Sequence, residues 1–162
     1  MPILRAFALI LLLAAPAVSA AQGFEIAFGG LQQDTNQPVE VTADSLSLNQ
    51  SDGTAVFKGN VMIVQGTMRM SAPEVLVYYN AEASGISRLV ASGRVLLVKE
   101  QDAAESDTAD YSIEKGTIEM AGDVLLTQKQ NTLNAGRMVV DLGAGTAVLD
   151  GRVKTILRSG GN

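Results

Sequence analysis

The chain has 162 residues, a length typical of a single domain, with 47% hydrophobic residues and a formal net charge of −5. It contains no Cys, His or Trp, which excludes a thiol nucleophile, an imidazole base and a Cys/His zinc site. The acidic balance argues against a nucleic-acid partner, because neutralising phosphates requires clustered Lys and Arg.

The first 20 residues predict a secretory signal peptide. Residues 1–5 carry one positive charge, residues 6–15 form an unbroken apolar run, and Val18-Ser19-Ala20 offers small residues for cleavage. The apolar run is shorter than the roughly 20 residues that a spanning helix needs, so a retained membrane anchor is the weaker alternative. We expect cleavage after Ala20 and export of the mature chain.

Residues 21–37 precede the first firm strand and predict a mobile arm. This arm has a short alternating pattern, and we expect it to add a strand when another strand pairs with it. The alternating residues are Phe24, Ile26 and Phe28. Pro38 then opens a strand at 39–42, where proline is tolerated because only its own donor is missing.

From there onward a unit recurs four times. Its main landmark is a Gly-x-(apolar) tripeptide with spacings of 34, 29 and 29 residues. The copies are Gly59-Asn60-Val61, Gly93-Arg94-Val95, Gly122-Asp123-Val124 and Gly151-Arg152-Val153. Self-similarity of this kind predicts stacked units. No helical periodicity follows the signal, so we expect an all-β domain of four rungs, each with about three short strands separated by glycine or polar corners.

A second landmark leads into a strand, with spacings of 29, 37 and 26. Its copies are Ala43-Asp44-Ser45-Leu46, Ala72-Pro73-Glu74-Val75, Ala109-Asp110-Tyr111-Ser112 and Ala135-Gly136-Arg137-Met138. This alignment places an acidic insertion at 100–107 in the longest interval. It also makes Asp44 and Asp110 equivalent, which predicts that both have a corner role through side-chain hydrogen bonds.

The acidic residues of this region are the main candidates for chemistry. They are Glu100, Asp102, Glu105, Asp107 and Asp110. Oxygen ligands suit calcium, but the spacing does not match the helix–loop–helix calcium motif, and a solvated insertion is the simpler interpretation. Paired carboxylates on a β-solenoid leave a polysaccharide hydrolase or lyase open as a minor alternative. We expect no enzymatic activity, no metal and no cofactor.

The two ends of such a stack present unpaired backbone groups. The candidate end strands are Val39, Glu40, Val41 and Thr42 at one end, and Val153, Lys154, Thr155, Ile156 and Leu157 at the other. The second strand contains no proline and one charge, so nothing in it blocks pairing. We therefore predict that the ends serve assembly by strand addition from another chain.

The apolar residues allow two interpretations of the interior. One is an ordinary sealed β core, and the other is a core open along one side that receives acyl chains, for which adaptable methionines are a suitable lining. The residues in question are Val61, Ile63, Leu76, Leu96, Val98, Ile113, Met120 and Met138. Composition alone does not separate the two.

Three segments carry a resemblance to a known family. They are Asp34–Val41 (DTNQPVEV), Ala43–Leu46 (ADSL) and Phe57–Met68 (FKGNVMIVQGTM). Together they resemble the periplasmic lipopolysaccharide-transport bridge proteins of the OstA-like (LptA) family. The similarity is strong from residue 34 to about 77 and weaker from there to about 157.

The resemblance implies an elongated antiparallel β-jellyroll over residues 38–158, V- or taco-shaped, with an open apolar groove and a flexible tail at 159–162. It implies a periplasmic protein that binds lipopolysaccharide by its lipid A acyl chains. Protomers of such proteins associate head to tail. They join an inner-membrane-anchored partner at one end of the bridge and an outer-membrane translocon at the other.

Matched positions imply six lipid contacts: Thr35, Val39, Val41, Val98, Tyr111 and Ile113. The chain departs from better-known members in its fewer basic residues and its short tail after Arg158, which leaves the docking of the C-terminal end open. Three alternatives to the bridge protein stand beside it. They are the membrane-anchored partner with the same fold, the polysaccharide-active enzyme, and a structural module with a sealed core.

Overall fold

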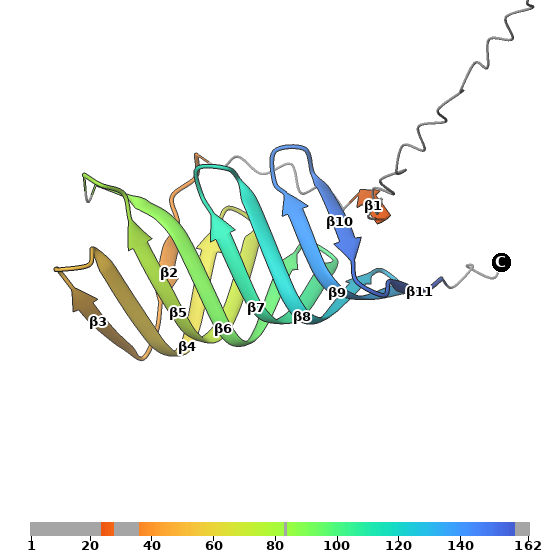
Figure 1. Ribbon diagram of the computed structural model, residues 1–162, viewed down its shortest axis with the longest axis horizontal. Helices are drawn as coiled ribbons and strands as arrows, with labels where there is room; N and C mark the ends of the chain where they lie inside the picture. The colour runs from red at the N-terminus through yellow and green to blue at the C-terminus, as the bar shows by residue number, and fades with distance from the viewer. Residues whose placement is uncertain (1–23, 28–35, 83, 158–162) are drawn as a thin grey trace, which may run out of the picture.

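A computed structural model describes residues 24–27, 36–82 and 84–157, and every regular element in these ranges is a β-strand (Figure 1). The strands form one antiparallel sheet in the order β1-β10-β9-β8-β7-β6-β5-β4-β2, while β3 also pairs with β4 and β11 with β9. The expected all-β fold is therefore confirmed. The strands are β1 (Phe24–Ala27), β2 (Glu40–Thr42), β3 (Ser45–Asn49), β4 (Thr54–Gln65), β5 (Met68–Tyr79), β6 (Ile86–Lys99), β7 (Asp102–Ser112), β8 (Thr117–Gln128), β9 (Asn131–Asp141), β10 (Thr146–Asp150) and β11 (Lys154–Ile156).

The Gly-x dipeptides of the repeat are the corners at which the chain bends. In β4 the backbone is left-handed at both Gly59 (φ 79°) and Asn60 (φ 46°), and the pairing with β5 shifts register between Lys58 and Val61. Left-handed backbone is uncommon outside glycine, and two such residues opposite one make a β-bulge that bends the strand sharply. The other three copies also have two positive φ angles: Gly93-Arg94, Gly122-Asp123 and Gly151-Arg152.

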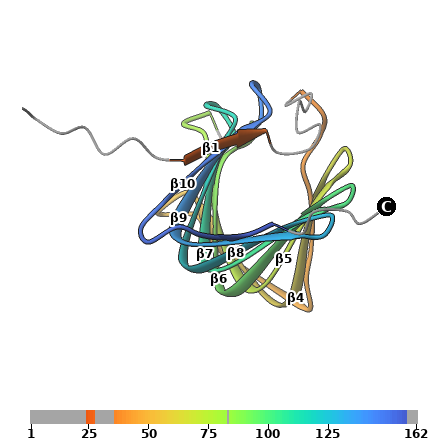
Figure 2. The same cartoon turned by 90° about the vertical axis from the view of Figure 1, so that its right-hand side faces the viewer.

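The corners stack into a line, which we call the seam, and the seam divides the sheet into two walls (Figure 2). The long-turn wall comprises residues 45–58, 74–92, 108–121 and 137–150, which end in turns of four or more residues. The short-turn wall comprises residues 40–42, 61–72, 95–106, 124–135 and 154–156, whose turns have two residues. Each unit of the repeat therefore consists of two long bent strands rather than about three short ones.

The corner of β7 is Asp107, which corrects the predicted equivalence of Asp44 and Asp110. Asp107 and Gly122 are neighbouring corners along the seam, just as Asp44 and Gly59 are. Asp44 has the predicted corner role: its backbone N–H donates to the Gly59 carbonyl (2.9 Å) and its carboxylate accepts from Asn60 Nδ2 (2.8 Å).

The extra length in the repeat lies in the turn between β5 and β6, not at 100–107. Consecutive corners are 14 or 15 positions apart, as from Asp44 to Gly59, except that Pro73 and Gly93 are 20 apart. Tyr79 pairs with Ile86, so residues 80–85 form the long turn that contains this insertion. Residues 102–107 instead belong to β7, an ordinary strand of the sheet.

The two ends of the sheet are made by the strands expected there. β2 and β3 form one end, and among the described strands both pair only with β4; β10 and β11 continue from β9 at the other end (Figure 1). Part of the predicted arm is also described, because β1 pairs antiparallel with β10, from Phe24 opposite Leu149 to Ala27 opposite Thr146. The predicted signal (1–20) and tail (159–162) lie outside the described residues.

The two walls meet at the seam and form a V in cross-section. Alternate side chains from both walls point into this V and form one apolar cluster. Val61, Leu97 and Met120 are examples, with 1%, 0% and 0% of their surface exposed. Fully burying a side chain of this size stabilises the fold by about 1.5–3 kcal/mol. The rim of each wall is its edge at the turns, opposite the seam, and the space between the two rims is the mouth. Among the described strands no ladder joins one rim to the other, so the sheet is folded but not closed.

The seam can be tested by adding a methyl group at a corner. A Cβ on Gly59 would lie 2.5 Å from Asp44 Oδ2 and 2.9 Å from Asp44 Cβ, whereas a Cβ on Gly53 (φ 61°) would meet nothing within 4 Å. We expect Gly59→Ala to lower the free energy of unfolding in urea by about 2–5 kcal/mol, from backbone strain plus overpacking.

Gly53→Ala is the matched control, because it has the left-handed strain without the steric clash. We expect it to lose about 1 kcal/mol. An equal decrease in the free energy of unfolding for the two variants would show that close contact between neighbouring corners does not constrain the fold.

Candidate functional site

The inward surface of the V is apolar over most of its depth. Val61 and Ile63 come from β4, Leu97 from β6 and Met120 from β8, and all are at most 1% exposed. Met68, Met70, Met120 and Met138 belong to the same buried cluster. Such a lining favours hydrocarbon, and its flexible thioether side chains can repack around chains of different shape.

Most of the buried polar side chains of the short-turn wall lie near its rim, and the exception is Ser106, which lies beside the seam. Gln65, Lys99 and Asp102 lie at the ends of half-strands beside the two-residue turns, and each is at most 6% exposed. Asp102 Oδ2 accepts a hydrogen bond from Gln128 Nε2 (3.1 Å), and burial lowers the pKa of Lys99. The interior is thus mainly apolar, with three of its buried polar side chains near the mouth.

A hydrogen bond between described residues connects the two walls across this mouth. The hydroxyl of Tyr111, on the long-turn wall, donates to Oε1 of Gln65, on the short-turn wall, over 2.5 Å. Gln65 Nε2 in turn donates to the carbonyl of Gln37 (2.9 Å). Burial raises the pKa of Tyr111 to about 12, so its hydroxyl remains a neutral donor at physiological pH.

Most of the predicted lipid contacts that are described lie at the interior. Tyr111 is fully buried, while Val39, Val41 and Ile113 are partly buried and pack against the apolar cluster. Val39 and Val41 are at the β2 end of the short-turn wall, and Ile113 is in the turn after β7. Thr35 lies outside the described residues.

Val98 is the exception, because the structure places it on the outer face. Its neighbours Leu97 and Lys99 are buried and point inward, and successive residues of a strand alternate between faces. Leu76 and Leu96 point outward for the same reason, with Leu96 38% exposed. Leu97, next to Val98, therefore faces the interior in its place.

Gln65 is an interior residue that sequence reasoning missed, as are Leu97 and Lys99. It lies within the segment that resembles the family, but it received no role there. Its position in the alternating pattern of the strand could have identified it. Val61, Ile63 and Gln65 occupy alternate positions on one strand, which places them on one face. A polar residue that ends an inward apolar row marks the rim of the wall.

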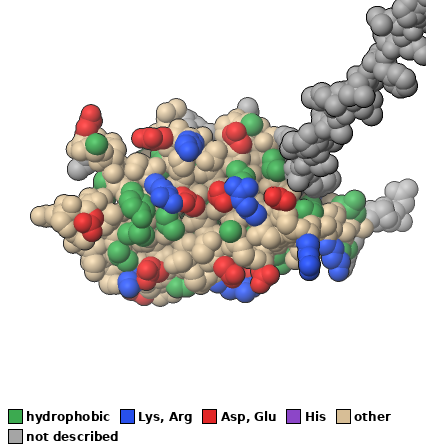
Figure 3. Space-filling model, in the orientation of Figure 1, with side chains coloured by type: hydrophobic (Ala, Val, Ile, Leu, Met, Phe, Trp, Pro, Cys, Tyr) green, Lys and Arg blue, Asp and Glu red, His purple; other side chains and the backbone are tan. Residues whose placement is uncertain are grey.

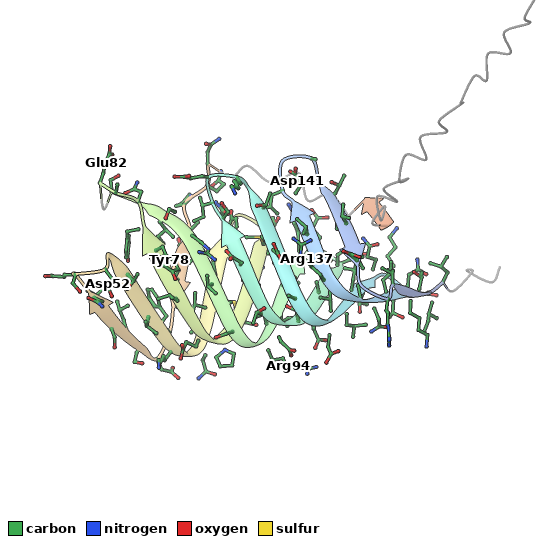
Figure 4. All side chains as sticks on the ribbon, viewed as in Figure 1. Asp52, Tyr78, Glu82, Arg94, Arg137 and Asp141 are labelled. Carbon is green, nitrogen blue, oxygen red and sulfur yellow. The ribbon has the colours of Figure 1, made fainter. Side chains whose placement is uncertain are left out.

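The acidic residues do not gather into a site. Within 36–82 and 84–157, no group of three or more His, Cys, Asp or Glu side chains is arranged to hold a metal ion. Several form exposed ion pairs instead: Asp110 pairs with Arg88, and Glu105 with Arg94 at 3.0 Å. Arg94 projects beyond the bent strands in Figure 4, and the face seen in Figure 3 mixes both signs of charge. Pairs of this kind each contribute about 0–1 kcal/mol.

No helix in the part of the chain that the structure describes is both long and apolar enough to cross a membrane.

An antiparallel sheet bent along a seam around an apolar interior defines the class of folded, unclosed β-jellyrolls. The profile of one family of this class, described as LptA/(LptD N-terminal domain) LPS transport protein, matches residues 40–146. The chain therefore belongs to this family of lipopolysaccharide transport proteins, as the resemblance predicted.

Individual relatives agree with the family. A protein of Rhizobium meliloti (strain 1021) without an assigned function is 29% identical over 145 residues, 83% of this chain and 78% of that one. Lipopolysaccharide export system protein LptH of Pseudomonas aeruginosa is 26% identical over 132 residues, 76% and 74% of the two chains. LptA of Haemophilus influenzae is 33% identical over 76 residues, 47% and 41% of the two chains.

The crystal structure of Pseudomonas aeruginosa LptH, the LptA-homologous periplasmic component of a lipopolysaccharide transport device, shares the fold. It superposes with a TM-score of 0.70 at 19% sequence identity, and the match covers 78% of this chain and 99% of that one. The V-shaped sheet is therefore the architecture of a solved relative.

Two adjacent leucines test which face of β6 belongs to the interior. We expect Leu97→Ala to lower the free energy of unfolding by about 2–5 kcal/mol, because it leaves a cavity in the buried cluster. Leu96→Ala removes the same atoms from the outer face, and we expect a loss of less than about 1 kcal/mol. A larger loss at Leu96 than at Leu97 in urea titrations would reverse the assignment of the two faces.

Proposed function

We propose that this protein carries lipopolysaccharide through the periplasm, from the inner to the outer membrane, with the acyl chains held between the two walls. The observation that carries this proposal is the continuous inward apolar surface, from β4 to β9, in a sheet whose two rims are not joined by strand pairing. A sealed β core would bury the same residues but would leave no rim through which a chain could pass. Membership of the transport family supports the carrier.

The energetics of a groove that opens suit a carrier. Burying one methylene is worth roughly 0.8 kcal/mol, so a fully enclosed chain of about twelve carbons would be held by about 10 kcal/mol. Several chains held at that strength would not be released. In the free protein the inward side chains already bury one another, so the walls must part to accept a chain, and the lost wall contacts offset part of the gain.

The acidic surface is consistent with recognition by the lipid tails. Most of the interior is apolar, with Lys99 as its one buried cation among the described residues, and the exposed Arg and Lys side chains that form ion pairs do so with acidic partners on the outer faces. A carrier that gripped the phosphates of its cargo would present clustered cations at the groove instead. We therefore assign binding to the acyl chains and leave the sugars outside the mouth.

The bridge itself requires contacts at both ends, and the end strands have the form needed. Within the strands that the structure describes, β2 and β3 each pair on one side only, and β11 pairs only with β9. Ile156 and Leu157 are 48% and 71% exposed beside that free edge. We propose that these edges add strands from a second copy of this chain, from an inner-membrane-anchored partner and from an outer-membrane translocon.

We also propose that residues 1–20 are removed on export. Sequencing the N-terminus of the mature protein separates the free carrier from an anchored partner with the same fold: a chain beginning at Ala21 is the carrier.

Photo-cross-linking tests where the lipid lies. We expect a photoreactive amino acid at Val41 or Ile113 to capture lipopolysaccharide in cells, because both residues pack against the interior cluster. The same amino acid at Val98 is the control, and we expect no capture there, because Val98 lies on the outer face. Capture at Val98 alone would contradict the groove as the binding site.

A proline in β11 tests assembly. We expect Thr155→Pro to weaken head-to-tail association, because proline removes a backbone donor and disturbs the end strand. Light scattering over a range of concentrations measures the oligomer size, and thermal unfolding of the variant checks that the monomer remains folded. A folded variant with an unchanged concentration dependence would argue against assembly through this edge.

A further inference from the structure

We propose that the Tyr111–Gln65 hydrogen bond is a clasp that holds the mouth of the groove closed and must open before an acyl chain can pass between the walls. The geometry of the bond is independent of the ligand, whereas the role of the clasp in lipid access rests on the proposed function. Neither the family nor the predicted contacts assign a role to Gln65.

The position of the bond makes it a clasp rather than an ordinary core contact. Gln65 is the last residue of β4, at the rim of the short-turn wall, and Tyr111 is next to the last residue of β7, near the rim of the long-turn wall. The two residues are 46 positions apart, and no strand pairing joins their half-strands. The bond therefore crosses the open side of the V, opposite the seam.

The surroundings of the bond determine what can open it. Both side chains are 0% exposed, and Gln65 is held in place by its second bond to the Gln37 carbonyl. A buried hydroxyl and amide that lose their partner in an apolar interior are strongly disfavoured. Opening is therefore easiest when the incoming molecule supplies replacement hydrogen-bonding groups.

This requirement suggests the chemical class of ligand that opens the clasp. A plain hydrocarbon chain offers neither a donor nor an acceptor, so it cannot replace the bond that the two groups make with each other. An acyl chain attached through an ester or amide, with a hydroxyl near the carbonyl, offers both at the point where the chain joins its headgroup. Such a molecule would place its linkages at the rim and its tails among residues such as Val61 and Met120.

Tyr111→Phe tests the clasp with the smallest change, because it removes the hydroxyl and keeps the ring. Tyr78→Phe is the matched control: Tyr78 lies on the long-turn wall with Arg88 over its ring, 5.3 Å from the centroid, and takes no part in the clasp. Gln65→Met is a second variant that removes the other half of the bond. Circular dichroism verifies that each variant folds.

The first readout needs no ligand. The chain has no cysteine, so spin labels can be attached at Thr67→Cys and Lys115→Cys, two exposed positions in the turns that follow Gln65 and Tyr111. Pulsed electron paramagnetic resonance measures the distance between the two labels across the mouth. We expect Tyr111→Phe and Gln65→Met to shift the distribution to longer distances, and Tyr78→Phe to leave it unchanged. Distributions that are the same in all the variants would overturn the clasp.

The second readout uses purified lipid A. We expect Tyr111→Phe to bind it about five-fold faster than the wild type or Tyr78→Phe, the factor that corresponds to one net hydrogen bond. Equal rates for the two phenylalanine variants would overturn the role of the clasp in lipid access. A wild-type protein that binds no lipid A would contradict the proposed function, while the label distances would still decide whether the clasp exists.

Discussion

The seam of left-handed corners is the constraint on which the rest of this structure depends. Because every long strand crosses the seam once, the sheet folds along one line and turns its two inward faces toward each other. The close approach of Asp44 to Gly59, and of Asp107 to Gly122, leaves no room for a Cβ at these glycines. The interior, the mouth and the two free ends all follow from this bend.

A lipid carrier needs a stable apolar surface and an opening through which the lipid can enter, and the folded sheet provides these two features in different places. The seam fixes the apolar floor through backbone pairing, so Val61 and Val95 remain inward whatever happens above them. Among the described strands no ladder joins the rims, and side chains such as Tyr111 and Gln65 that meet there can part without breaking one. A rigid base with a weakly joined mouth lets a groove be buried in the free protein and still admit a chain.

The sequence predicted the corners well, because a Gly-x dipeptide with two left-handed residues leaves a strong local signal at Gly59, Gly93, Gly122 and Gly151. It misplaced the corner of β7, because Ala109-Asp110 imitates Ala43-Asp44 while the true corner, Asp107, lacks the alanine. It could not choose the inward face of Val95-Leu96-Leu97-Val98, because an unbroken apolar run has no alternation to read. The Tyr111–Gln65 hydrogen bond could not be predicted from the sequence, because the two residues are 46 positions apart and are brought together by the fold.

A structure of the protein with bound lipid A would test the central claim most directly, namely that the space between the walls receives acyl chains. We predict that the chains lie between the walls in contact with Val61, Leu97 and Met120, that the rims are farther apart than in the free protein, and that the seam is unchanged. Lipid A bound to an outer face, with the inward side chains packed as they are now, would contradict it.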